Sequence, residues 1–237
     1  MADVESANTV GYDTATAPKN SFIAVGVQFV DPLTDAVRTV AISNLVETTN
    51  PRTGNAMNNN VDQIHVWTGN AWRKYYNKTG VGYVLNGAAD TSKATSDTVS
   101  VGDCVFFRKG NHKDGGEAKI CGAIYSGDTV EYSLPKNAFT FVAYPWPVDF
   151  SIAKFAEIIS NPRAGAAMNN NVDQIHVWTG NAWRKYYNKN GVGYVENGAA
   201  DTSKATEDSI EPGVGVFIRK GNHKDGGTVT FTKPAFL

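Results

Sequence analysis

The feature that most constrains the fold of this chain is an internal repeat. Residues 57–78 and residues 168–189 both read MNNNVDQIHVWTGNAWRKYYNK, so the two copies are offset by 111 residues. Shorter identical stretches follow at the same offset, such as RKGNHKDGG at 108–116 and 219–227. Such self-similarity indicates that one structural unit occurs twice in the chain.

The repeat also extends upstream of these stretches. Residues 18–22 (PKNSF) resemble residues 135–139 (PKNAF) at an offset of 117, so the first unit is six residues longer, within residues 29–50. We therefore expect the 237 residues to form two tandem domains, one over 1–121 and one over 122–237.

Strand signals dominate each unit. Residues 21–30 and 138–146 are rich in apolar and β-branched side chains, which is typical of strands. Only one short helix is expected in each unit, at residues 41–47 and at residues 151–160. Short strands separated by Gly- and Asn-containing turns predict an all-β fold, with two tandem β-sandwich or barrel-like units.

The clearest local prediction is a hairpin over residues 63–77. A Gly-Asn pair at its centre is typical of a tight turn between two strands. If that pair is the loop, Trp67 faces Trp72 and His65 faces Lys74 across the strands.

The aromatic residues of this hairpin and of its copy are the most distinctive candidates for a functional surface. Alternation along a strand sends about half of them into the core. The others are expected at an interface between units or protomers, or against a ligand such as a sugar ring. The candidates are Trp67, Trp72, Tyr76, Trp178, Trp183 and Tyr187.

The two cysteines are expected to form a disulfide. Residues 98–108 and 117–123 suggest a second hairpin around a glycine-rich turn, which would place Cys104 opposite Cys121. Neither cysteine has a counterpart in the second unit, as expected for a bonded pair gained or lost together. The alternative is two free thiols in the core.

Composition and motifs exclude several classes of protein. The 22 basic and 23 acidic side chains give a net charge of −1, which is unfavourable for binding nucleic acid or an anionic membrane. No run of about 18 apolar residues suggests membrane insertion. The sequence contains no HExxH, CxxC, GxSxG or calcium-loop pattern. We therefore expect no catalytic residues, no metal ligands and no cofactor.

Several segments resemble a family of exported β-rich repeat proteins from bacteria of the Verrucomicrobia, Kiritimatiellota and Lentisphaerae groups. They are ESANTVGY at 5–12, DQIHVW with the following aromatic residues at 62–76, AYPWPVD at 143–149 and PGVGVFIRK at 212–220. In that family the ESANTVGY stretch follows a signal peptide. The resemblance therefore implies export, with Met1 replacing a removed signal, but it implies no functional residues.

These observations lead to a functional expectation. The chain begins without a basic and apolar signal sequence, and its Asn-, Thr- and Gly-rich composition is typical of exported β proteins. We expect an extracellular or cell-surface structural protein, a subunit of a filament, tube or layer, that self-assembles through heterologous contacts between its two units. The terminal segments 2–18 and 228–237 are candidates to add strands to a neighbouring copy. The alternatives are a carbohydrate-binding module that uses the tryptophan hairpins and, third, a secreted hydrolase.

Overall fold

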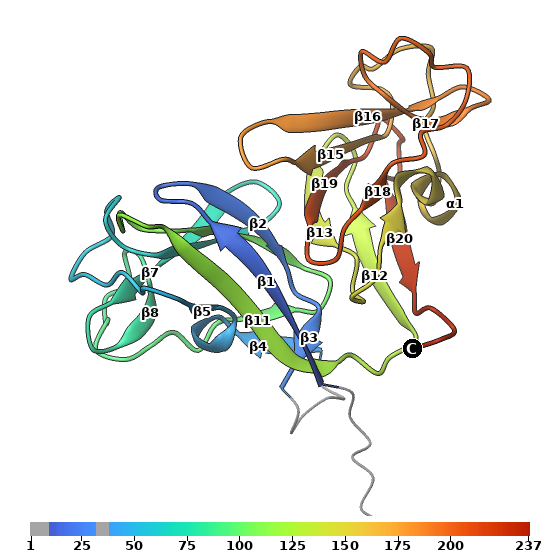
Figure 1. The fold of residues 1–237 in the computed structure, drawn as a ribbon. Helices are drawn as coiled ribbons and strands as arrows, with labels where there is room; N and C mark the ends of the chain where they lie inside the picture. Colours follow the sequence, from blue (N-terminus) through green and yellow to red (C-terminus); the bar gives the residue numbers. More distant parts are fainter. Residues whose placement is uncertain (1–9, 32–37) are drawn as a thin grey trace, which may run out of the picture.

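The computed structural model describes residues 10–31 and 38–237, and most of its regular structure is antiparallel β-sheet (Figure 1). The all-β prediction is therefore confirmed. Part of the segment in which the first unit is longer, residues 32–37, lies outside the described residues, as do residues 1–9. None of the helices in the described part is long and apolar enough to cross a membrane.

The first half of the chain, up to residue 124, forms two larger sheets and one short two-stranded ribbon. The larger sheet has five strands in the order β2 (Phe22–Gly26), β10 (Cys104–Arg108), β6 (Gln63–Trp67), β7 (Trp72–Lys78) and β8 (Gly82–Leu85). The smaller sheet has the order β1 (Val10–Ala17), β11 (Gly116–Ile124) and β3 (Phe29–Val30), and β5 (Glu47–Thr48) also pairs with β11. A short ribbon joins β4 (Thr39–Ala41) to β9 (Thr98–Ser100).

The second half repeats this plan. Its five-stranded sheet has the corresponding order β13 (Phe139–Ala143), β19 (Gly215–Arg219), β15 (Gln174–Trp178), β16 (Trp183–Lys189) and β17 (Gly193–Glu196). Two further pairs are β12 (Thr129–Leu134) with β20 (Gly227–Thr232), and β14 (Phe150–Ser151) with β18 (Ser209–Ile210). Figure 1 shows the blue-to-green first half and the yellow-to-red second half side by side.

Each half has its own apolar core beneath one face of its five-stranded sheet. In the first half, Ile64 and Phe107 from that sheet pack in one buried cluster with Val30 and Ile120 from the smaller sheet. The second half contains an equivalent cluster of Val142, Ile175, Ile218, Val130 and Phe231. Two sheets that enclose an apolar layer form a β-sandwich.

The predicted tryptophan hairpin is confirmed in both copies, with the expected register. Trp67 faces Trp72 and His65 faces Lys74. The turn requires a glycine because Gly69 has a φ of 97°, in the left-handed region that other residues rarely adopt.

The predicted second hairpin is wrong, and so is the disulfide that depended on it. Strand β10 pairs with β2 and β6, whereas β11 pairs with β1, β3 and β5 in the other sheet. The glycine-rich loop between them crosses from one sheet to the other, because β11 carries Ala118 and Ile120 that close the core. Cys104 is a buried free thiol and Cys121 is an exposed one.

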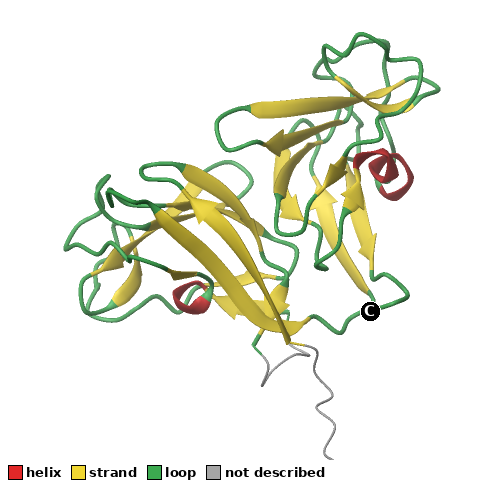
Figure 2. Cartoon of the chain, in the orientation of Figure 1, coloured by secondary structure: helices red, strands yellow, loops and turns green. Residues whose placement is uncertain are grey.

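The helical segments are shorter than predicted, because isolated turns of this length gain little from helix formation. Residues 42–44 form one 3-10 turn, and residues 152–154 form another that continues into α1 (Phe155–Ile158) (Figure 2). Ser151 is the residue before the second turn, and its side chain makes no capping hydrogen bond.

The ends of the described chain pair internally. Strand β1 pairs with β11 and β20 pairs with β12, so residues 10–17 and 227–232 are strands of the protein's own sheets. Residues 2–9 of the predicted N-terminal strand-donating segment lie outside the described residues. The predicted division between residues 121 and 122 falls within β11, whose partners all lie in the first half; the domain division stays a prediction.

Candidate functional site

The second face of each five-stranded sheet carries a row of aromatic side chains. Residues directly opposite each other on paired strands project from the same face. His65 is opposite Phe106 on β10, and Trp67 is opposite Trp72 on β7. The Tyr75 side chain projects from the opposite face of the sheet, by strand alternation, and is buried in the apolar core. The sheet therefore separates core residues from a set of rings on its outer face.

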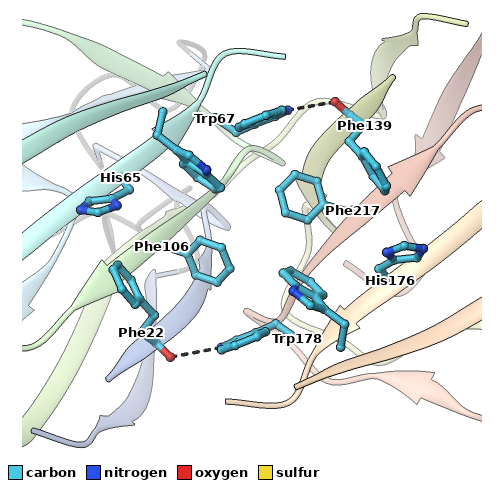
Figure 3. A pocket seen from close by; sticks show the side chains of 10 residues that line it. Phe22, His65, Trp67, Phe106, Phe139, His176, Trp178 and Phe217 are labelled. Atoms are coloured by element: carbon cyan, nitrogen blue, oxygen red, sulfur yellow. Dashed lines mark hydrogen bonds between the residues drawn. The ribbon is translucent and has the colours of Figure 1, made fainter. Parts of the chain in front are cut away.

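The aromatic faces of the two halves lie against each other, and they exchange reciprocal hydrogen bonds. The Trp67 indole Nε1 donates to the main-chain oxygen of Phe139 over 2.9 Å. The equivalent Trp178 Nε1 donates to the main-chain oxygen of Phe22 over 3.1 Å (Figure 3). Each half thus contributes the same donor and the same acceptor, as in an isologous interface.

Main-chain hydrogen bonds between the halves follow the same reciprocal pattern. The Gly26 N–H donates to the Gly213 carbonyl over 2.7 Å, and the Ala143 N–H donates to the Gly102 carbonyl over 2.8 Å. Gly26 and Ala143 are equivalent positions in the repeat, as are Gly102 and Gly213. The two halves are therefore related by a pseudo-two-fold axis.

The axis explains why some equivalent residues differ between the halves. A Cβ atom added at Gly215 would meet the Cys104 Sγ atom, and it would lie 2.8 Å from the Cys104 Cβ atom. Likewise, a Cβ atom added at Gly26 would meet the Cβ atom of Ala143. A two-fold axis places equivalent positions against each other, so one partner of each pair must be small. A cysteine at position 215 would therefore collide with Cys104, which accounts for the glycine there without reference to a disulfide.

A pocket of about 500 Å³ lies between the two aromatic faces. The largest rings make equivalent cross-contacts, since Trp67 lies 5.7 Å from Phe217 and Trp178 lies 5.7 Å from Phe106, measured between ring centres. All ten lining residues have aromatic rings, and they form five equivalent pairs: Phe22, His65, Trp67, Trp72 and Phe106, with Phe139, His176, Trp178, Trp183 and Phe217 (Figure 3). We call this site the aromatic pocket.

The two histidines of the aromatic pocket are neutral at physiological pH. Burial, together with the nearby charges of Lys74 and Arg108, lowers the pKa of His65 to about 4, and burial likewise lowers the pKa of His176 to about 4. The Gln63 amide nitrogen donates to the Asn58 carbonyl over 2.7 Å, which turns the amide oxygen toward His65 Nε2 at 2.9 Å. His65 Nε2 therefore carries the hydrogen, and Nδ1 is left as an acceptor.

The structure brings together four of the six residues singled out from the sequence. Trp67, Trp72, Trp178 and Trp183 line the aromatic pocket. Tyr76 and Tyr187 do not: they are buried in two small separate clusters farther along the strands. At Tyr76 this burial is accompanied by a hydrogen bond from its hydroxyl to the Asn55 carbonyl over 3.4 Å.

Four phenylalanines of the pocket were missed by the sequence analysis. Phe22 and Phe139 begin β2 and β13, and Phe106 and Phe217 lie in β10 and β19. The repeat itself contained a signal. Phe106 and Phe217 are identical in the two copies, whereas the adjacent core position has Phe in one copy and Ile in the other.

Among the ten lining residues, His65 and His176 are the two whose side chains can take part in acid–base or nucleophilic chemistry. None of the ten side chains is a carboxylate, thiol, hydroxyl or amine. Within the described residues, no three His, Cys, Asp or Glu side chains lie close enough to hold a metal ion. The aromatic rings of the pocket can stack on a ligand, and the histidines can accept a hydrogen bond.

Comparison with family models, with curated proteins and with solved structures found no match. The resemblance to exported bacterial repeat proteins, and the extracellular location that it implies, stay predictions.

Proposed function

We propose that this protein is a binding protein without catalytic activity, which takes a small molecule with an aromatic or extended apolar body into the aromatic pocket. The observation that carries the proposal is the pocket itself, which has a volume of about 500 Å³ and is lined by ten aromatic rings. Ligand sites of proteins are commonly apolar concavities of about 300–1,000 Å³ with few polar groups. Both halves contribute equally to this one.

An aromatic body suits the pocket better than a sugar does, although sugar binding by the same tryptophans was our alternative from the sequence. A sugar needs hydrogen bonds for its hydroxyl groups as well as a stacking surface. The indole N–H groups of Trp67 and Trp178 already donate to main-chain carbonyls across the interface. The lining therefore offers stacking area but few free donors.

The neutral aromatic probe N-phenyl-1-naphthylamine tests the proposal. Four of the five tryptophans of the chain line the pocket, so titration with the probe should change the intrinsic tryptophan fluorescence. We expect saturable binding to the native protein. In the double variant Trp72→Ala/Trp183→Ala, the loss of two ring contacts should weaken binding about tenfold or more.

The matched control is Tyr12→Ala, which removes an aromatic ring that is 71% exposed on β1, outside the pocket. This variant should bind the probe as the native protein does. Absence of saturable binding by the native protein, or equal binding by the double tryptophan variant, would overturn the proposal.

Self-assembly into a filament, tube or layer is our second candidate, and one observation favours it. Strand β1 is an edge strand of eight residues that pairs only with β11 among the described strands. An unpaired edge offers main-chain donors and acceptors to a second chain. The pseudo-two-fold contact joins like faces within one molecule, so an open assembly would use such an edge and not the aromatic faces.

Sedimentation and electron microscopy of concentrated protein test this second candidate. Regular polymers that disappear when a lysine replaces exposed Tyr12 would support it. A monodisperse monomer across salt and pH would count against it, and that result would leave the binding proposal unaffected.

A further inference from the structure

Cationic side chains lie beside each histidine of the aromatic pocket. Lys74 is directly opposite His65 in the pairing of β6 with β7, so both side chains project from the pocket face. The guanidinium carbon of Arg108 lies 5.8 Å from the centre of the Phe22 ring, which itself lines the pocket. One side of the pocket is therefore positively charged.

The repeat places the same charges at the other side. Lys185 is opposite His176 in the pairing of β15 with β16, and the guanidinium carbon of Arg219 lies 5.8 Å from the centre of the Phe139 ring. Figure 3 shows the two histidines at opposite sides of the pocket. The pocket thus has an aromatic middle and two equivalent cationic ends.

These four cations lack acidic partners. In the described part of the chain, none of Lys74, Lys185, Arg108 and Arg219 forms an ion pair. The two guanidinium groups donate to main-chain carbonyls, at 3.0 Å for Arg108 and 2.8 Å for Arg219, which fixes them in place without neutralising them. The ten lining residues include no acidic side chain, and the four cations lie at the margin of the pocket, next to its histidine and phenylalanine rings.

The charges around the aromatic pocket indicate whether its ligand is a cation or an anion. Tryptophan rings alone attract cations such as quaternary ammonium groups. Four uncompensated cations at the ends of the pocket oppose a cation and favour an anion.

We propose that the ligand is a planar aromatic anion whose ring system occupies the middle of the aromatic pocket. Its carboxylate, sulfonate or phosphate group lies at one end, beside Lys74 and Arg108, or at the equivalent end, beside Lys185 and Arg219. A ligand with two such groups would use both ends. The inference rests on the proposed function, since it names the ligand class for the same pocket.

Two probes of similar shape separate this inference from the proposed function. 8-Anilinonaphthalene-1-sulfonate and N-phenyl-1-naphthylamine share an aromatic skeleton, and only the first carries a negative charge. We expect the native protein to bind the sulfonate about threefold to tenfold more tightly at low salt. Because exposed charges are screened, 0.5 M salt should remove most of this preference, with a Debye length then of about 4 Å.

The double variant Lys74→Gln/Lys185→Gln should lose the preference and still bind the neutral probe. The control Lys113→Gln/Lys224→Gln makes the same change in net charge at two lysines whose side chains are 85% and 84% exposed in loops. This control should keep the preference.

The outcomes are distinguishable. If neither probe binds, the proposed function fails. If both probes bind equally tightly, or if the Lys74/Lys185 variant keeps the preference for the sulfonate, the binding proposal stands and the aromatic-anion inference is overturned.

Discussion

Replacing Gly215 with alanine tests the pseudo-two-fold packing directly. The new Cβ atom would meet the Cys104 Sγ atom, and it would lie 2.8 Å from the Cys104 Cβ atom and 3.2 Å from an edge carbon of Phe141. Gly215 has no positive φ, so its backbone accepts an alanine without strain. The only expected cost is the steric conflict across the axis.

The magnitude follows from two opposing effects. Overpacking in a close-packed interior costs about 1–3 kcal/mol of unfolding free energy. An alanine in a strand otherwise gains about 0.5–1 kcal/mol over glycine. We expect Gly215→Ala to lower the stability by about 1–2 kcal/mol, with a midpoint temperature about 2–8 °C lower for a chain of this size.

Urea unfolding of a double-mutant cycle measures the conflict itself. In a Cys104→Gly background the obstructing side chain is gone, so Gly215→Ala should be neutral or stabilising there. Gly54→Ala is the matched control, because its added Cβ atom would lie 2.6 Å from the Val61 Cγ1 atom, in a cluster separate from that of Cys104, and Cys104→Gly should not relieve this conflict. An equal cost of Gly215→Ala in both backgrounds, or no cost in either, would refute the pseudo-two-fold reasoning.

Three further predictions concern single groups. In the native protein, a thiol reagent should label exposed Cys121 at once and Cys104 only after unfolding, because burial protects the Cys104 thiol and raises its pKa. Labelling of both thiols, or of neither, in the native state would contradict the structure. His65 should titrate near pH 4 in nuclear magnetic resonance spectra, because burial lowers its pKa to about 4 from 6.5. Because His65 binds a proton more readily in the unfolded chain than in the folded one, the unfolding free energy should fall as the pH drops from about 6.5 to 4. His65→Gln should make this decline less steep. A titration midpoint of His65 near 6.5 in the native protein would contradict the prediction. Asp62→Asn should lower the unfolding free energy, measured by urea unfolding, by about 3–5 kcal/mol. In the native protein the fully buried Lys109 ammonium lies 2.9 Å from an Asp62 carboxylate oxygen, and the substitution removes this counter-charge. A loss below about 1 kcal/mol would be inconsistent with that ion pair.

Local features of the fold could be predicted from the sequence, because their causes are local. The Trp67–Trp72 register follows from a Gly-Asn turn and from alternation over a few residues. The same alternation predicts that Tyr75 enters the core and that its neighbours do not. Alternation places Tyr76 on the outer face, but Tyr76 is buried there because a loop from residues 55–61 covers that end of the face.

The pairing of strands that are far apart in the sequence could not be predicted from such local patterns. A glycine-rich link between two strands is compatible with a hairpin and with a crossover between sheets. The choice between them depends on whether β11 completes the smaller sheet, which involves partners as distant along the chain as β1. The disulfide prediction failed for the same reason, since it assumed that Cys104 and Cys121 lay on neighbouring strands.

By itself, the sequence determined that one β-rich unit occurs twice and that its aromatic residues concentrate in a duplicated hairpin. Only the tertiary structure decided that the two aromatic faces meet each other, which makes the pocket and leaves Gly215 no room for a cysteine. The physical reason is that repetition and alternation are encoded along the chain, whereas a pseudo-two-fold axis arises from packing between residues more than a hundred positions apart.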